Sequence, residues 1–287
     1  MIQEVTDRDL NRIREFLETH VETSLFLLSN LAELGHRLTD HLNSGNYRYI
    51  EENGEIQAVF CLTRRGNILA QSAGRTDCAA AILQSCECEP IQIQGVVAEW
   101  TIADAIWQRL CGNFRFHPTF TSKETLFSLE LSNASLNPLD AKTVRPLIPE
   151  DFTDWLKLNN DYLVEEGLPV QGTTAQREAQ FVEQSTAGFW WGAVENGKLA
   201  ATVALNAKHD GIGQVGGVYT LPEKRRKGLA RRAMQLLIND SINRHHLQKL
   251  ILFTGEHNVA ARELYKNLDF TTSGHFALLF GNWDKLA

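Results

Sequence analysis

The sequence lacks the patterns that mark membrane, nucleotide-fold and secreted proteins. No apolar run is long enough to cross a bilayer, and the N-terminal residues show no cationic stretch followed by an apolar one. No Gly-Lys-Ser/Thr motif follows a glycine-rich turn, which excludes a P-loop, and Gly213, Gly216 and Gly217 lack the spacing of a dinucleotide fingerprint. We therefore expect a soluble cytoplasmic protein that makes no membrane contact.

Cysteine is present but gives no sign of a disulfide framework or a metal site. All five cysteines lie in the first half of the chain, and their odd number favours free thiols. Cys86-Glu87-Cys88 has no histidine or second cysteine pair nearby at ligand spacing. We predict no bound metal.

The net charge of −7 is unevenly distributed. The acidic excess lies in residues 1–141, whereas the basic residues of the second half gather between Lys224 and Arg232. This arrangement suits a small polyanionic ligand better than a nucleic-acid duplex, so we expect no nucleic-acid partner.

At 287 residues the chain exceeds the usual size of one domain. The polar segment Ser132–Asp140 has turn composition and no hydrophobic periodicity, so we place a boundary there, with domains at 1–133 and 141–287.

The hydrophobic periodicity predicts the same order of elements in both halves, which indicates an internal duplication. In the first half it predicts helices near 10–17 and 25–34, strands at 47–51, 57–63 and 67–72, a helix at 77–83, a strand at 91–96, a helix at 101–110 and a strand at 126–131. In the second half it predicts a strand at 144–147, a helix at 149–158, a loop at 161–167, a helix at 174–183, strands at 189–195, 199–207 and 213–220, a helix to 245, a strand at 250–254 and a last helix after Asn258.

The stretch from Val218 to Arg232 is the most informative part of the chain. An apolar strand stops at Pro222, a basic loop follows, and helical spacing begins at Gly228. The free N–H groups and positive dipole of a helix start bind anions, and Gly228 and Ala230 leave room for a ligand near the backbone. A solvated basic helix start is the simpler alternative. In the first half the corresponding segment, Ser72–Asp77, has neither the basic run nor this spacing.

Two motifs together resemble the GNAT superfamily of CoA-dependent N-acyltransferases. Arg225, Gly228 and Ala230 match Gln/Arg-x-x-Gly-x-Gly/Ala. About thirty residues later, Asn258, Ala261, Leu264, Tyr265 and Phe270 match Asn-x-x-Ala-x-x-Leu-Tyr-x-x-x-Gly-Phe, with Asp269 where the family usually has glycine. Aspartate there still permits the left-handed turn that closes a helix.

The resemblance implies an α/β fold with a mixed, mostly antiparallel sheet flanked by helices. We expect two tandem copies: a degenerate copy without a CoA loop at 1–133 and a catalytic copy at 141–287. The residues of the motifs resemble those of bacterial two-domain members of the superfamily.

The resemblance also implies acetyl-CoA as the cosubstrate. The backbone of the strand end would pair with pantetheine, the N–H groups of the loop would hold the pyrophosphate, and the basic side chains would add charge. The expected cofactor-binding residues are Val218, Tyr219, Thr220, Arg225, Arg226, Lys227, Gly228, Leu229, Ala230, Asn258 and Ala261.

The candidate catalytic residue is Tyr265, which matches the family position that protonates the leaving thiolate. Because Ala261, Leu264 and Leu268 complete a helical stripe with it, a plain core role stays open. Asn258 has a similar alternative as a helix N-cap. Near pH 7 an alkyl amine with a pKa of about 10 must lose a proton before it attacks.

The general base is not identified by the sequence, since the strand before the motif carries Gln214, Gly216 and Gly217. Candidates elsewhere are Glu165, Glu166, His209, Glu256 and His257, and a water chain is an equal alternative. Asp161 and Glu165 could instead attract a cationic amine.

The predicted function is transfer of an acetyl group to a small amine or amino acid by direct attack, with a homodimer possible. The alternative is a non-catalytic acyl-CoA sensor or scaffold.

Overall fold

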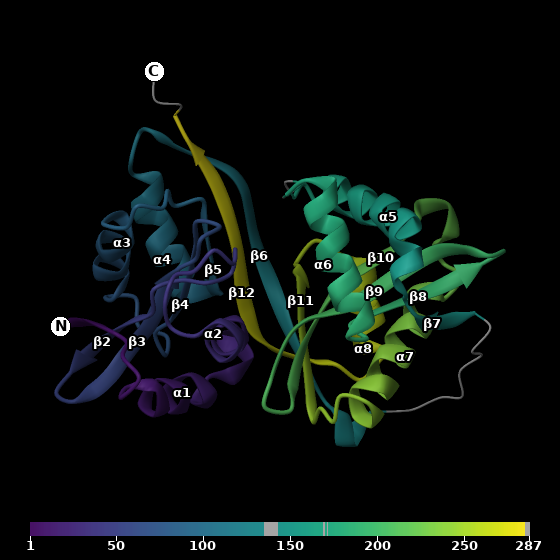
Figure 1. The fold of residues 1–287 in the computed structure, drawn as a ribbon, viewed down its shortest axis with the longest axis horizontal. Coiled ribbons are helices and arrows are strands. Elements are labelled where there is room, and N and C mark those ends of the chain that lie inside the picture. The colour runs from purple at the N-terminus through teal and green to yellow at the C-terminus, as the bar shows by residue number, and fades with distance from the viewer. Residues whose placement is uncertain (135–142, 169, 171, 285–287) are drawn as a thin grey trace. The chain divides into compact units, whose positions relative to one another are not determined.

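A computed structural model describes residues 1–134, 143–168, 170 and 172–284 (Figure 1). Most of the expected interdomain segment, from residue 135 to 140, and the expected first residues of the second domain therefore lie outside the described residues. The chain divides into two compact units. Unit 1 contains Met1–Leu126, Phe253–His257 and Ser273–Ala287, and unit 2 contains Phe127–Leu252 and Asn258–Thr272.

Besides the first part of β6 (Phe116–Glu130), unit 1 contains six paired strands and four helices among its described residues. They are β1 (Ile2–Glu4), α1 (Leu10–Thr19), α2 (Val21–Leu34), β2 (Arg48–Glu52), β3 (Glu55–Leu62), β4 (Asn67–Gln71), α3 (Ala79–Glu87), β5 (Gly95–Glu99), α4 (Trp100–Cys111) and β12 (Thr271–Trp283). The strand order is β1-β2-β3-β4-β5-β12, and only β4 and β5 in this series pair in parallel.

Both faces of the unit 1 sheet are covered by helices. Along β3, Phe60 packs in a cluster with residues of α3 and α4, whereas its neighbour Cys61 packs with residues of α1 and α2. Successive side chains of a strand point to opposite faces, so an almost continuous apolar run serves two cores.

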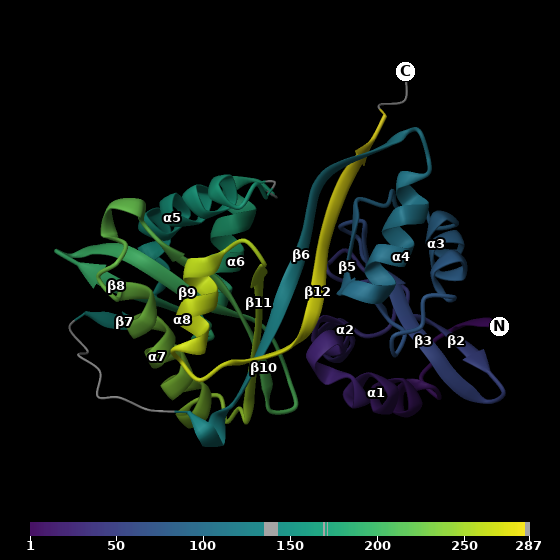
Figure 2. The same cartoon turned by 180° about the vertical axis from the view of Figure 1, so that it is seen from behind.

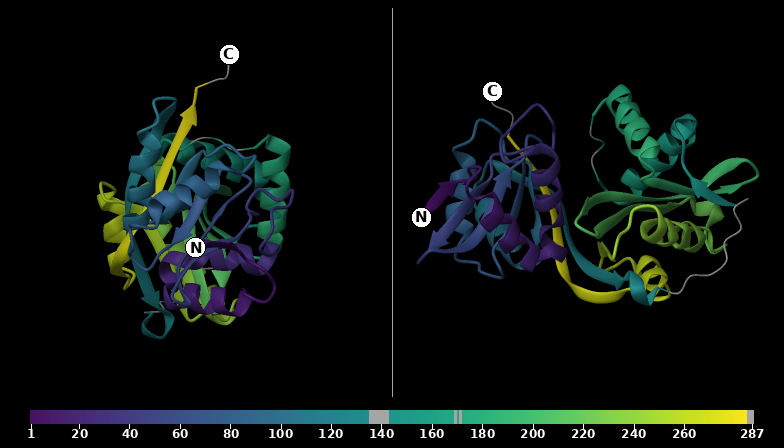
Figure 3. Two further views of the ribbon diagram at one scale, coloured as in Figure 1. Left: turned by 90° about the vertical axis from the view of Figure 1, so that its left-hand side faces the viewer. Right: turned by 60° about the horizontal axis from the view of Figure 1, so that its bottom comes forward.

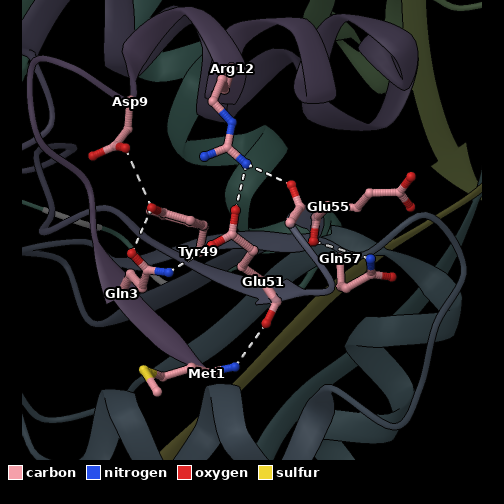
Figure 4. A network of polar contacts seen from close by, with 9 residues as sticks. Met1, Gln3, Asp9, Arg12, Tyr49, Glu51, Glu55 and Gln57 are labelled. Carbon is pink, nitrogen blue, oxygen red and sulfur yellow. Dashed lines mark hydrogen bonds and ion pairs between the residues drawn. The ribbon is translucent and has the colours of Figure 1, made fainter.

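A polar network ties β1 and α1 to the sheet (Figure 4). Arg12 forms an ion pair with Glu51 at 2.5 Å, and Gln3 donates a hydrogen bond to the same carboxylate at 2.8 Å. The Tyr49 hydroxyl donates to the Gln3 side-chain oxygen at 2.9 Å. These contacts hold a short edge strand in register.

Unit 2 repeats the same order of elements. It contains β7 (Val144–Pro146), a 3₁₀ turn (Pro149–Asp151), α5 (Phe152–Glu165), α6 (Thr174–Thr186), β8 (Trp190–Glu195), β9 (Lys198–His209), β10 (Ile212–Thr220), a second turn (Pro222–Lys224), α7 (Leu229–Asn243), β11 (Lys249–Gly255) and α8 (Val259–Lys266). The strand order is β11-β10-β9-β8-β7, with β10 and β11 parallel.

Helices also cover both faces of the unit 2 sheet. Trp155 of α5 and Phe181 of α6 pack on one face, while Leu237 of α7 and Tyr265 of α8 pack with Val215 on the other. Figure 2 labels α7 and α8, and the right-hand view of Figure 3 shows the strands of this unit between the two helical layers.

The closing strands are exchanged between the two halves of the sequence. β12 follows α8 of unit 2 but pairs with β5 of unit 1, from Phe276↔Glu99 to Phe280↔Gly95. β6 (Phe116–Glu130) follows α4 of unit 1, yet its last residues, from Phe127, join the core of unit 2. One cut near residue 134 therefore does not separate the two units.

Most of the predicted elements are confirmed, the strand predicted at 91–96 lies instead at Gly95–Glu99, and one element is wrong. The segment 161–167, predicted as a loop, continues α5 as far as Glu165. Gly167 has φ 67°, and Leu168 N–H donates to the Leu163 carbonyl while Gly167 N–H donates to Val164. This is a Schellman end, so the helix stops at its glycine and not at the polar residues before it. The long β12 was not predicted.

Candidate functional site

The last strand before the basic loop, β10, is interrupted by a bulge. Its register against β9 shifts between Gly216 and Tyr219, and Thr202 of β9 donates its hydroxyl to the Gly217 carbonyl at 3.0 Å. Gly217 has φ 58°, and a Cβ there would lie 2.8 Å from the ring of Trp190, so glycine is required. Within unit 2, β11 pairs with β10 as far as Val215↔Leu252, which leaves one edge of Gly217–Thr220 available beside the loop.

The loop after β10 presents a run of backbone donors. Arg226 and Gly228 both have left-handed backbone conformations, with φ 63° and 73°, and α7 starts at Leu229 with no side-chain cap. The first helical bond is from Arg232 N–H to the Gly228 carbonyl. In the described part of the chain, the N–H groups from Arg226 to Arg231 donate to no other protein group. Such a concave series of N–H groups at a helix start is an anion site.

Space is available at the same point. A Cβ added at Gly228 would meet no atom within 4 Å. The Ala230 side chain is small, so a bulky anion can approach the N–H groups. The N–H groups from Arg226 to Ala230 therefore border an open space.

The basic side chains of the loop are partly neutralised by acids from elsewhere in unit 2. Lys224 and Lys227 both pair with Glu195 of β8, Lys227 at 3.3 Å, and these two lysines hold the pKa of Glu195 below its ordinary value. Arg225 pairs with Glu165 at the end of α5. Among the described residues, Arg226 forms no ion pair.

Tyr219 lies under the Arg225 side chain. The guanidinium carbon is 5.6 Å from the centre of the Tyr219 ring, and Arg225 Nε donates to the Thr220 carbonyl at 3.0 Å. Burial, followed by the nearby Glu165 carboxylate, raises the pKa of Tyr219. Tyr162 of α5 meets the same ring edge-on at 6.0 Å. Tyr219 is therefore a packing residue as well as a strand residue, while Val218 packs on the opposite face.

The start and end of α8 follow from its sequence. Asn258 caps the helix, and its side-chain oxygen accepts from Ala261 N–H at 3.1 Å. Asp269 has φ 66°, and Phe270 N–H donates to the Tyr265 carbonyl at 3.1 Å. Aspartate therefore makes the left-handed helix end that the motif predicted, and Asn258 does act as an N-cap.

Tyr265 belongs to the core of unit 2. Its side chain is 4% exposed, and its ring meets Phe127 edge-on at 5.8 Å and Phe270 at 6.2 Å. The aromatic packing fixes the direction in which the hydroxyl points. A core role is thus observed, and a catalytic role depends on the hydroxyl alone.

The candidate bases are scattered. His209 pairs with Ile212 at the start of β10, five residues before Gly217, which corresponds to about 17 Å of extended strand. Glu256 and His257 belong to unit 1, where Glu256 contacts Lys123 and His275 at 3.7 and 3.4 Å. Glu165 is the candidate beside the loop, and its carboxylate is paired with Arg225.

Sequence reasoning missed several residues that shape this region. Thr202 donates a hydrogen bond to the carbonyl exposed by the bulge, and the Trp190 ring leaves no room for a side chain there. Glu195 forms ion pairs with two lysines of the loop. None follows a local pattern, because each comes from a neighbouring strand.

The site lies in the segment that matches a known family. Residues 152–270 match the model of the acetyltransferase (GNAT) family. This match assigns the segment, which is less than half of the chain, to a GNAT acetyltransferase domain. Solved structures agree with the fold over nearly the whole chain. No protein with a curated description matches.

Three solved structures illustrate the similarity. A protein from Drosophila is 14% identical with a TM-score of 0.66, covering 96% of this chain and 97% of its own. A GCN5-related N-acetyltransferase from Sphaerobacter thermophilus is 15% identical with a TM-score of 0.59, covering 99% and 95%. A tandem GNAT protein from the clavulanic acid biosynthesis pathway is 13% identical with a TM-score of 0.53, covering 100% and 99%. At these identities the likeness concerns the fold.

The GNAT fold with its loop supports acetyl transfer in general. Over the ranges that the structure describes, no cluster of three or more His, Cys, Asp or Glu is placed to hold a metal ion. No helix in those ranges has the length and apolarity needed to cross a membrane.

Proposed function

We propose that the chain transfers an acetyl group from acetyl-CoA to the primary amine of a small molecule or amino acid. The observation that supports this most is the run of unpaired N–H groups from Arg226 to Arg231, placed directly after a bulged strand in the GNAT segment. A pyrophosphate fits such a run because its oxygens accept several hydrogen bonds at once and its charge suits a helix start.

The residues proposed to hold acetyl-CoA divide into three groups. The N–H groups of Arg226, Lys227, Gly228, Leu229 and Ala230 would bind the pyrophosphate. The backbone edge of Val218, Tyr219 and Thr220 would pair with the pantetheine amides as an added strand. Arg226 is the loop side chain with no ion-pair partner among the described residues, so its charge is the most available.

Asn258 and Ala261 would flank the cofactor at the start of α8. Because the Asn258 oxygen is used in the cap, its side-chain N–H₂ is the group left to orient the ligand.

Acetyl-CoA supplies a thioester whose sulfur is a good leaving group once it is protonated. We assign Tyr265 as the proton donor to that sulfur. The aromatic packing around its ring limits the hydroxyl to one direction, which is the preorganisation that a general acid needs.

The attacking amine must lose its proton by another route. On β10 the position of a strand base is held by Gln214, whose amide does not ionise; its N–H donates to the Val215 carbonyl at 2.7 Å. Water is therefore the proposed acceptor of the proton, and the rate should rise with pH as the fraction of neutral amine rises.

The test is release of free thiol from acetyl-CoA across a panel of small amines and amino acids, with CoA binding measured separately by calorimetry. The proposal expects binding and, for at least one amine class, amine-dependent thiol release. CoA binding without release across the panel would favour the second candidate, a non-catalytic acyl-CoA sensor or scaffold. This second candidate is retained because Gln214 of β10 has an amide side chain, which cannot ionise and so cannot act as a general base.

A further inference from the structure

The side chain of Arg225 occupies a cation-binding arrangement built by other parts of unit 2. Its guanidinium pairs with the Glu165 carboxylate and lies 5.6 Å from the centre of the Tyr219 ring. The charge of Glu165 also acts on the Tyr219 hydroxyl and, after burial, raises its pKa. A carboxylate beside an aromatic face is how proteins recognise ammonium and guanidinium groups.

A second carboxylate lies close to this arrangement. Asp161 precedes Glu165 by one helical turn on α5, and its charge acts on Tyr219. Residues four apart lie on the same side of a helix. Among the described residues, Asp161 forms no ion pair, so the α5 side of Tyr219 carries one more negative charge than Arg225 neutralises.

Arg225 also has a second possible partner within reach. It precedes Gly228 by three residues and is adjacent to the run of N–H groups that would bind a pyrophosphate. Arginine binds phosphate oxygens through two parallel N–H groups, and a pyrophosphate offers more charge than one carboxylate. The side chain is 41% exposed, so it is free to exchange partners through rotation.

We propose that Glu165 and Tyr219 form the binding site for the cationic group of the acceptor amine, that Arg225 fills this site in the free protein, and that CoA empties it by drawing Arg225 to the pyrophosphate. This rests on the proposed function. It identifies the acceptor as a molecule that carries a cationic group in addition to the amine that reacts, and it gives Glu165 a binding role in place of a role as general base.

The first test measures CoA binding alone, by calorimetry, in the full chain. Glu165→Gln should bind CoA about twofold to fivefold more tightly, because Arg225 no longer has to leave a carboxylate; that range corresponds to an exposed ion pair. Glu178→Gln on α6 is the matched control and should bind as the unmodified chain does. In an Arg225→Gln background, Glu165→Gln should have no effect.

The possible results are distinct. Unchanged or weaker CoA binding in Glu165→Gln contradicts the inference, as does an equal gain in the Arg225→Gln background. Failure of the unmodified chain to bind CoA contradicts the proposed function as well. Thermal unfolding of each variant checks that the fold is intact.

The second test uses 1,4-diaminobutane as the cation probe. Its affinity should be several-fold higher with saturating CoA than without, and Glu165→Gln should remove that gain. Equal diamine affinity with and without CoA, or a gain retained in Glu165→Gln, overturns the inference.

Discussion

Two strand–turn–helix segments of this chain occupy the same place in the order of elements and end in opposite ways. In unit 2 the turn between β10 and α7 leaves six consecutive N–H groups, from Arg226 to Arg231, without a protein partner among the described residues. In unit 1, N–H groups of the turn between β4 and α3 donate hydrogen bonds to groups in or next to the same turn. Gln71 accepts from Ala73 N–H at 2.8 Å, and Arg75 N–H donates to the Ser72 carbonyl.

The helix start of unit 1 already carries an anion. The Asp77 carboxylate lies one residue before the N-cap of α3 and is bound by Arg75, which lowers its pKa. An internal carboxylate thus lies beside the helix start of unit 1, where the corresponding turn of unit 2 is proposed to bind a phosphate.

The strands differ in the same sense. β4 pairs with β3 without a register shift from Val59↔Gln71 to Leu62↔Ile68, whereas the corresponding pairing of β10 with β9 is bulged before the loop. A shared order of elements therefore does not imply a shared ligand. What differs is whether the turn satisfies its own donors.

The largest effect is expected at the aromatic residue of α8. In unit 1 the corresponding helix presents Trp107, which meets Phe116 edge-on at 5.3 Å, much as Tyr265 meets Phe127. Tyr265→Phe keeps the ring and removes the hydroxyl. It should lower turnover about a hundredfold or more, as loss of a general acid does, with little change in acetyl-CoA affinity. Steady-state kinetics and calorimetry check this, and full turnover would reduce Tyr265 to a core residue.

The second prediction concerns a variant that places an aspartate before the N-cap of α7, where unit 1 has Asp77 before the N-cap of α3. Lys227 precedes the N-cap of α7 as Asp77 precedes that of α3. Lys227→Asp should weaken CoA binding about tenfold to a hundredfold, because a charge-assisted contact is lost and a carboxylate competes for the N–H groups. The reciprocal Asp77→Lys is the control, and its CoA affinity should match that of the unmodified chain. Equal losses in both variants would contradict the difference between the turns.

A third pair of variants uses matched glycines. Gly228 and Gly74 have φ 73° and 80°, and a Cβ at either would meet no atom within 4 Å. Alanine should cost each about 1 kcal/mol of unfolding free energy through its left-handed backbone. Gly228→Ala should also weaken CoA binding about fivefold, while Gly74→Ala should not, which calorimetry measures directly. Similar CoA affinities in the two variants would show that the unit 2 turn is not the site.

The smallest effect concerns pH and is specific to unit 2. His245 donates its Nε2–H to the Gly188 carbonyl, 3.1 Å away, and lies beside Phe189 and Trp191. Burial, followed by Lys208 and Arg244, lowers its pKa, so the folded state favours the neutral ring. The unfolded chain, with a histidine pKa of about 6.5, gains the proton first. Stability should therefore fall as the pH drops from about 7 through the folded-state pKa.

Denaturant unfolding at pH 7.5 and 5.5 measures this loss, and His245→Gln should reduce it. His246→Asn is the neighbouring control, since asparagine tolerates the φ of 53° at that position. A control that abolishes the pH dependence equally would remove His245 from the explanation.

The local parts of this picture could be predicted from the sequence, and the non-local parts could not. The turn at Gly228, the cap at Asn258 and the helix end at Asp269 each depend on a few adjacent residues, and all three are found. Partners such as Glu165 and Glu195 are brought to the loop from other elements by the sheet. The exchange of β12 into unit 1 is likewise a pairing of distant strands that no local pattern reports.

One part of the prediction failed for a local reason. The acidic and polar residues of 161–167 predict a loop, but no helix breaker precedes Gly167, so α5 continues to Glu165. The last residue of this helix, Glu165, is the acid that pairs with Arg225 in the loop after β10.

The most direct test of the difference between the two turns is the structure of the full chain in complex with CoA. The account predicts one CoA per chain, with pyrophosphate oxygens within hydrogen-bond distance of the N–H groups from Arg226 to Ala230 and with the Ser72–Asp77 turn unchanged. A pyrophosphate bound at Ser72–Asp77, or at neither turn, would contradict it.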